Sequence, residues 1–450
     1  MSPYGPEALP GVHVAPWTFA EAPGLWMAAL VVGLLISGLA ALRSLPEWLR
    51  ALAFVLGQTV ALTTPLAAVL DRWVYGAFPT VDKAGSLRFY LDGVHRHMLT
   101  DPAGSLHDPA AHLIGVQVGH LWVTELFDLV LSPFGAMNAQ ALLYPAFAWW
   151  AASRLSVEAG SDPRAAILAG FPFGLGLHVF RDLHWYTIEK AAVGWLALYA
   201  WLGLRAIRTG KGTIPAAIVF AIATWMNLYL GLVAGAMAFL AATAVSVLDR
   251  ERARTALAVL ALSFVFVLPL AIWQLRLLGG DRTATPDQYL WERAALDAFT
   301  LRPLAWDRIE AWRALDPIAL VAAGLGIASM RTRWTLAALA GAFALFVVSL
   351  GPFLVPSIPN PLYLAVRDLV PGFWRVAKPE VFFEGVWLVL LVFAARGFGR
   401  VATTAPRAAL VYVAMVAVWL GTTRAHPAFP GFSLPQEIRP VSDWEKGVLQ

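Results

Sequence analysis

Apolar runs long enough to cross the hydrocarbon core of a bilayer recur along almost the whole chain. A helix needs roughly 20 apolar residues to span that core of about 30 Å. Of the 450 residues, 59% are hydrophobic and 14% are charged. A soluble domain is nearer to half apolar and about a quarter charged. Because the apolar excess is collected into blocks, the sequence predicts an integral membrane protein.

These blocks predict about twelve transmembrane helices, and therefore an all-α membrane fold. They lie at about 24–42, 51–70, 136–154, 164–179, 190–207, 213–228, 230–247, 256–276, 316–330, 334–352, 380–397 and 408–422. The stretch before the first block contains no basic residue, whereas a signal peptide needs a positive segment there. No signal peptide is expected.

Basic residues in the short connections set the orientation, because Lys and Arg stay on the cytoplasmic side. With these spans, the basic connections all fall on one side: Arg43/Arg50, Arg154/Arg164, Arg205/Arg208/Lys211, Arg250/Arg252/Arg254, Arg331/Arg333 and Arg396/Arg400/Arg407. We therefore expect a multi-pass protein of the cell's inner (cytoplasmic) membrane, with both termini on the outer, periplasmic side.

The segment 112–134 is apolar enough to be taken for one more span. Counting it would move the later basic connections to the outer side. It also holds His112, His120, Glu125 and Asp128, which are costly in lipid. We interpret it as an amphipathic or re-entrant element at the outer surface.

The resulting protein is asymmetric. We treat residues 1–450 as a single multi-pass domain with outer regions at 71–135, 277–315 and 353–379 and an outer tail at 423–450. All 9 histidines and most aspartates map to the outer side or its edge. Loops longer than about 15 residues are usually functional or disordered. These are rich in Trp and apolar residues, which favours function and interfacial helices.

The first outer region offers Asp82 as a carboxylate near the membrane surface. Such a group can deprotonate a hydroxyl or hold a metal ion, although a solvated loop aspartate is the plainer interpretation. His95, His97, His107 and His112 follow it, but their spacing matches no closed zinc site. The sequence leaves the metal unknown.

The short outer connection HVFRDLHWYTIEK gathers Arg181, Asp182, His184 and Trp185 between two spans. Trp, Tyr and Arg are ordinary headgroup anchors. Asp182 and His184 do not fit that role well, which makes them candidate functional residues.

The third outer region carries Arg375 and Lys378 just before a span. Guanidinium and ammonium groups there can hold a lipid phosphate, or can simply snorkel towards anionic lipid. Glu380 and Glu384, at the start of that span, need a partner or a cavity.

Several chemistries are excluded or given no support. The chain has no cysteine, which rules out disulfides and thiolate catalysis. It has no Walker A loop, and its charge is explained by topology without nucleic acid. Gly231 and Gly235 form a small-xxx-small pair, which predicts close helix packing.

Three passages resemble the GT-C superfamily of integral-membrane glycosyltransferases, over roughly residues 75–400. They are Thr80-Val81-Asp82, the run from LFDLVLSPFGAMNAQALLYP to GLGLHVFRDLHW, and SLGPFLVP followed by PLYLAVRDLVPGFWRVAKPEVFF. The resemblance implies inverting transfer of a hexose or pentose from a polyprenyl-phosphate sugar. The acceptor would be a glycan, lipid or protein of the envelope.

Carried onto this chain, the resemblance makes Asp82 the general base or a ligand of a divalent metal. Arg375 and Lys378 would bind the donor phosphate. Asp182 would line the opposite wall with His184, and Arg181 and Trp185 stand in the same connection.

Two other functions stay open. The chain is also compatible with a lipid or solute transporter, although a transporter should place ionisable groups at mid-membrane. It is likewise compatible with a catalytically inactive GT-C-like protein that binds polyprenyl lipid or scaffolds an envelope complex.

Overall fold

The structure is a computed structural model, and it is mostly helical. It describes residues 14–15, 23–63, 74–75, 111–176, 179, 191–277, 299–300, 313–314, 317–330, 332–355, 358–370, 373, 379–405, 407 and 432–433. The chain forms two compact units, which are described separately. Unit 1 comprises residues 1–147, 179–192 and 424–450, and unit 2 comprises residues 148–178 and 193–423.

The predicted apolar segments coincide with helices wherever the structure describes them. The helices are α1 (Pro23–Gly38), α2 (Glu47–Leu62), α5 (Ala111–Asp128), α6 (Pro133–Glu158), α7 (Pro163–Gly174), α10 (Gly194–Thr209), α11 (Thr213–Met226), α12 (Leu228–Leu248), α13 (Arg250–Leu277), α15 (Pro317–Ser329), α16 (Arg333–Ser349), α17 (Pro361–Leu369) and α18 (Phe383–Thr404), with the short 3₁₀ helices η1 (Leu39–Ala41) and η5 (Pro379–Phe382). The last predicted segment, 408–422, lies outside the described residues.

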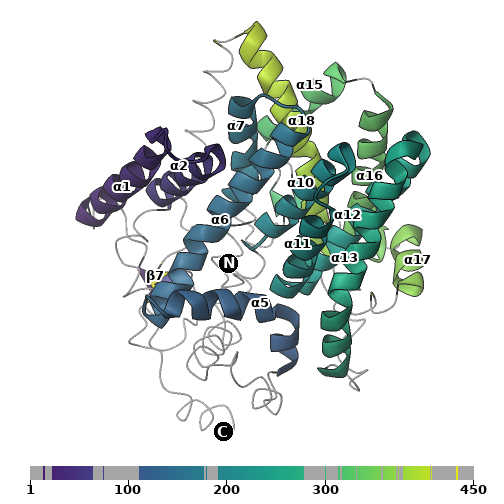
Figure 1. The fold of residues 1–450 in the computed structure, drawn as a ribbon, viewed down its shortest axis with the longest axis horizontal. Helices are drawn as coiled ribbons and strands as arrows, with labels where there is room; N and C mark the ends of the chain where they lie inside the picture. The colour runs from purple at the N-terminus through teal and green to yellow at the C-terminus, as the bar shows by residue number, and fades with distance from the viewer. Residues whose placement is uncertain are drawn as a thin grey trace. The chain divides into compact units, whose positions relative to one another are not determined.

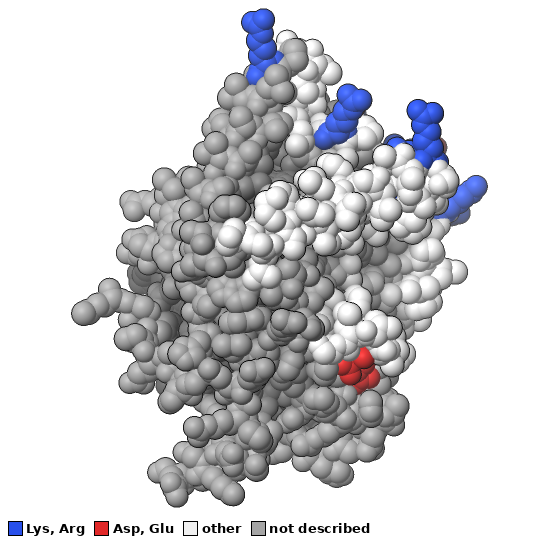
Figure 2. Space-filling view, turned by 90° about the vertical axis from the view of Figure 1, so that its left-hand side faces the viewer, with Lys and Arg blue, Asp and Glu red and all other residues white. Residues whose placement is uncertain are grey.

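Four helical stretches within the described residues are long and apolar enough to cross a membrane. They are Pro23–Ala41, Leu228–Leu248, Arg250–Ile272 and Pro379–Thr404. Three shorter apolar helices are Thr213–Met226, Ala319–Ser329 and Arg333–Ser349. The mostly helical structure and the four helices long enough to span a membrane agree with the prediction of an all-α membrane protein. The total of about twelve spans stays a prediction. Figure 2 shows a face whose described surface is largely uncharged, with Lys and Arg side chains projecting along its upper edge and acidic side chains lower down.

In unit 1, α1 and α2 form a tight helical hairpin. A Cβ on Gly33 would lie 2.6 Å from the carbonyl oxygen of Gly57, so only glycine permits this approach. The side chain of Gln58 donates a hydrogen bond to Ser37 Oγ at 3.1 Å. Small residues and one polar contact therefore fix this pair, while many of the remaining apolar side chains of α1 are exposed.

The rest of unit 1 joins distant parts of the chain. Figure 1 shows α5 lying across the start of α6, and α5 is not among the helices that qualify as membrane spans. The strands β1 (Val14–Ala15), β2 (Val74–Tyr75) and β7 (Phe432–Ser433) form an antiparallel sheet in the order β1-β7-β2. Segments near both termini and at the start of the predicted first outer region therefore pair in one sheet.

In unit 2, α10 to α13 pack side by side (Figure 1). The turn between α10 and α11 contains Gly210 and Gly212, both with positive φ, where glycine is favoured. A Cβ on Gly231 would clash with the side chain of Thr224, which confirms the predicted close packing at this position. A Cβ on Gly235 would meet only the Phe220 ring, at 3.7 Å.

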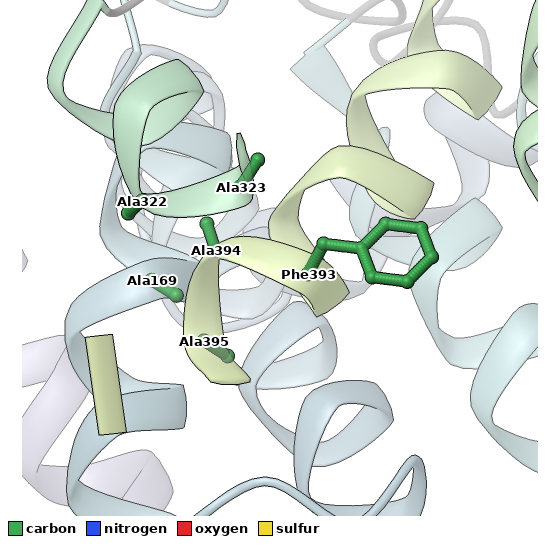
Figure 3. Packing of buried hydrophobic residues seen from close by; sticks show 6 residues of the cluster. All are labelled: Ala169, Ala322, Ala323, Phe393, Ala394 and Ala395. Carbon is green, nitrogen blue, oxygen red and sulfur yellow. The ribbon is translucent and has the colours of Figure 1, made fainter. Parts of the chain in front are cut away.

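A second part of unit 2 packs α7, α15 and α18 around a core of small side chains. Figure 3 shows the alanines of α15 and α18 facing one another. The buried cluster consists of Ala169, Ala322, Ala323, Phe393, Ala394 and Ala395. Gly326 of α15 and Gly397 of α18 let the two backbones touch, because a Cβ on either glycine would overlap a carbonyl oxygen of the other helix. Close backbone approach through small residues is the usual way for apolar helices to associate.

The basic connections of unit 2 meet at one end. Arg208 of α10 pairs with Glu158 of α6 at 3.2 Å, which joins the ends of these two helices. Ile207 packs on the cluster of Ala242, Val245 and Ala256, which adds the end of α12 and the start of α13. The side chain of Arg396 reaches Met330, at the turn between α15 and α16. The sequence predicts that the basic connections share one side of the membrane, and those of unit 2 do lie at one end of its helices. We call this the basic end of unit 2.

The other end of unit 2 carries the described parts of two predicted outer regions. Strand β3 (Phe299–Thr300) pairs in parallel with β4 (Arg313–Ala314). Strand β5 (Phe353–Val355) pairs antiparallel with β6 (Ile358–Pro359), and α17 follows. A short helix in the third outer region agrees with the expectation of helices in these loops.

Candidate functional site

The seven residues that the sequence proposes for the site all lie outside the described residues: Asp82, Asp182, His184, Arg181, Trp185, Arg375 and Lys378. Their roles stay predictions. The structure does describe the framework on which some of them are carried.

Two buried glutamates stand at the start of the helix that follows Arg375 and Lys378. Glu380 is 7% exposed and Glu384 is 5% exposed, and they lie four residues apart, on adjacent turns. Neither residue is without a partner. Removing a carboxylate from water is costly unless it is paired and hydrogen-bonded. Because both carboxylates are buried, they need partners, as the sequence predicts.

The chain on both sides of Arg375 and Lys378 is buried. Phe373 is 2% exposed, and its ring centroid lies 5.6 Å from that of Tyr363 and 5.6 Å from that of Phe382. Pro379, which follows Lys378, is also buried. The predicted phosphate-binding segment thus starts and ends on packed residues, which suits a role that depends on position.

Asn360 fixes the chain before this segment. Its side-chain amide donates hydrogen bonds to the carbonyl oxygens of Val347 at 2.6 Å and Gly351 at 2.8 Å. Its side-chain oxygen accepts from the backbone N–H of Tyr363 at 3.2 Å and so caps α17. The sequence analysis missed Asn360, although an Asn-Pro step before an amphipathic segment is a helix-start signal.

A similar arrangement borders the connection that carries Arg181, Asp182 and His184. Val179 before it and Ala191 after it are both fully buried. The connection is thus bordered by packed residues on either side.

Unit 1 contains a buried polar cluster that the sequence analysis did not single out as a site. His120 is 1% exposed, and its Nδ1 lies 2.9 Å from the Tyr144 hydroxyl oxygen. Gln140 donates through Nε2 to the His120 carbonyl oxygen at 3.0 Å and to Thr124 Oγ1 at 2.8 Å. Burial lowers the pKa of His120 from 6.5 to about 3, which leaves the imidazole neutral at physiological pH. The sequence signal that could have revealed this cluster is the presence of polar residues inside otherwise apolar helices.

The described residues contain no group of three His, Cys, Asp or Glu side chains placed to hold a metal ion. His95, His97 and His107 lie outside the described residues, and the side chain of His112 is not described. Metal dependence therefore stays open.

No protein-family model matches the chain, and no curated protein matches its sequence.

Proposed function

We propose that the chain is a membrane glycosyltransferase of GT-C type. It transfers a sugar, with inversion, from a polyprenyl-phosphate donor to an envelope acceptor on the outer face of the membrane. The observation that carries the proposal is the pair of buried carboxylates, Glu380 and Glu384, directly after the segment with Arg375 and Lys378. Buried ionisable groups at the end of an apolar helix are costly and usually functional.

In this proposal the cations and carboxylates have different tasks. Arg375 and Lys378 hold the donor phosphate by charge-assisted hydrogen bonds and stabilise the charge that grows on it as it leaves. Glu380, in η5, and Glu384, in the first turn of α18, orient those cations. Glu384 lies at the start of α18, whereas Arg396 lies towards its other end, at the basic end of unit 2. This separation supports chemistry on the side of the membrane opposite to the basic end.

The transfer itself is a single displacement. The acceptor hydroxyl oxygen forms a bond to the anomeric carbon while the bond from that carbon to the phosphate oxygen breaks. Asp82 takes the hydroxyl proton, and the polyprenyl phosphate leaves with the bonding electron pair. Asp182, His184, Arg181 and Trp185 orient the sugar.

The transporter alternative is less well supported by the described part of unit 2. A transporter places ionisable groups at mid-membrane on broken helices. Here α12 contains no charged residue, and the charged residues of α13 and α16 lie near the ends of those helices. An inactive lipid-binding protein would share the same helices, and only an activity measurement separates it from the enzyme.

The test is sugar transfer from polyprenyl-phosphate donors in membranes that contain the wild-type chain or Asp82→Asn. A missing general base lowers the rate by about a hundredfold or more, so we expect that loss in Asp82→Asn. The matched control is Asp368→Asn, which removes an exposed carboxylate of α17 and should leave the rate unchanged.

Equal activity in the wild-type chain and Asp82→Asn would remove Asp82 from catalysis and move the role to Asp182. Absence of transfer in the wild-type chain, with a panel of such donors, would contradict the enzyme and favour the lipid-binding alternative.

A further inference from the structure

Among the helices that reach the basic end of unit 2, only some expose large apolar side chains. Examples are Ile214 on α11, Phe239 on α12, Phe264 on α13, Val321 on α15 and Phe343 on α16. None of the large apolar side chains of α7, α10 or α18 is exposed. In a membrane protein, exposed apolar side chains face lipid tails, which are equally apolar. The first five helices therefore form the lipid-facing perimeter of unit 2, and α7, α10 and α18 do not contribute to it.

On α13 the lipid-facing side chains form a stripe that ends in a cation. Leu257, Phe264 and Leu268 are exposed, and their spacing places them on one face of the helix. Arg254 precedes Leu257 by three residues, so it lies on the same face, and it is exposed as well. The guanidinium therefore stands where the apolar surface of α13 ends, at the basic end of unit 2.

The same step from apolar to basic occurs at two other helices. On α16, Arg333 is exposed and precedes the exposed Leu336 by three residues. Trp334, next to Arg333, is 43% exposed, and exposed tryptophans favour the headgroup level of a bilayer. Before α11, Lys211 is exposed and precedes the exposed Ile214 by three residues. We call Lys211, Arg254 and Arg333 the perimeter cations.

The perimeter cations have no carboxylate partner in the part of the chain that the structure describes. The acids described at this end are Glu158, Asp162, Asp249 and Glu251. Glu158 pairs with Arg208 at 3.2 Å, and Asp249 pairs with Arg252 at 3.4 Å. Asp162 caps α7, where its side chain accepts from the backbone N–H of Arg164 at 2.9 Å. Glu251 alone does not offset three cations, so positive charge remains in excess along the perimeter.

We propose that the lipid-facing perimeter of the basic end binds anionic phospholipid headgroups through the perimeter cations. Each cation meets the headgroup of a lipid whose tails lie along the apolar stripe of the same helix. Exposed basic residues at the headgroup level attract anionic lipid in this way. In the predicted orientation these lipids belong to the cytoplasmic leaflet. This surface is separate from the proposed transferase site and does not depend on it.

The test measures which lipids stay bound to the full chain after purification from detergent that contains equal amounts of phosphatidylglycerol and phosphatidylcholine. Mass spectrometry of the retained lipids gives the ratio of the two. One cation near a lipid surface strengthens the attraction of anionic lipid about fivefold. We expect the wild-type chain to retain phosphatidylglycerol preferentially. In the triple variant Lys211→Gln, Arg254→Gln, Arg333→Gln the ratio should fall by at least about fivefold.

The matched control is the triple variant Arg164→Gln, Arg205→Gln, Arg400→Gln. It removes the same charge from exposed cations of α7, α10 and α18, the helices without exposed large apolar side chains. The control should keep the lipid ratio of the wild-type chain. A second measurement needs no variant: about 1 M salt should weaken the preference of the wild-type chain, because it screens exposed charges.

Loss of the preference in the perimeter variant alone, together with its weakening in salt, supports the proposal. An equal loss in both triple variants would mean attraction to net charge, and an unchanged ratio in the perimeter variant would remove these cations from lipid binding. Either result overturns the proposal. Absence of any preference in the wild-type chain would also overturn it, and would favour an acidic protein as the partner of this surface.

Discussion

Individual buried polar residues are exceptions in this largely apolar chain, and each needs a hydrogen-bond partner. In unit 1 the imidazole of His120 is enclosed between α5 and α6 and lies next to the Tyr144 hydroxyl. Its low pKa has a defined consequence for stability. The unfolded chain takes up a proton near pH 6.5, while the folded protein resists protonation until about pH 3.

Folding is therefore most favoured above pH 6.5, and the contribution of His120 is lost as the pH falls from 6.5 towards 3. Each pH unit in that window costs about 1.4 kcal/mol. We expect the wild-type chain to lose about 2 kcal/mol more than His120→Gln between pH 8 and pH 5. The thermal unfolding midpoint at the two pH values measures this. The same midpoint shift in both proteins would contradict it.

At the level of helices, the closest contact between α15 and α18 depends on glycines, which have no side chain to hold the backbones apart. Gly326 and Gly397 bring α15 and α18 into backbone contact beside the alanine cluster of Figure 3. The gain is close van der Waals contact over the length of the interface. A single methyl group at either glycine must push the helices apart.

We therefore expect Gly326→Ala to destabilise the protein by about 1–3 kcal/mol, as overpacking does. Gly324→Ala is the matched control on the same helix, because nothing lies within 4 Å of its added Cβ. It should be neutral or stabilising by up to about 1 kcal/mol, since alanine favours helix over glycine. Unfolding midpoints in detergent measure both. A Gly326→Ala protein as stable as the control would show that α15 and α18 are not this close.

Over the whole molecule, the sequence predicted the helices, and the grouping of the basic connections of unit 2 at one end, better than it predicted contacts. Apolar runs define helices locally, so α11 and α12 were predicted close to their observed bounds. The basic connections followed from the same runs. The contact of His120 with Tyr144 did not, because the residues are 24 positions apart and meet only through the crossing of α5 and α6.

The packing glycines show the same distinction. Gly231 was predicted because its motif lies within one helix, whereas Gly326 and Gly397 lie in different helices and share no local pattern. For the site, the sequence flagged Glu380 and Glu384 because acids at the start of an apolar span are costly. Asn360 was missed, because its role depends on hydrogen bonds to the carbonyl oxygens of residues 347 and 351, which come together only in the folded turn.

In the proposed topology the basic end of unit 2 is cytoplasmic, and α17 and the proposed site lie on the outer side. The chain has no cysteine, so each introduced cysteine is the only one to react. The measurement is labelling by a membrane-impermeant maleimide in right-side-out vesicles. Lys211→Cys marks the basic end, and Ile358→Cys marks the exposed strand β6 before α17. We predict that Ile358→Cys is labelled in sealed vesicles and that Lys211→Cys is labelled only after lysis. The reverse pattern, or labelling of both in sealed vesicles, would contradict this topology and with it the outer-face transferase.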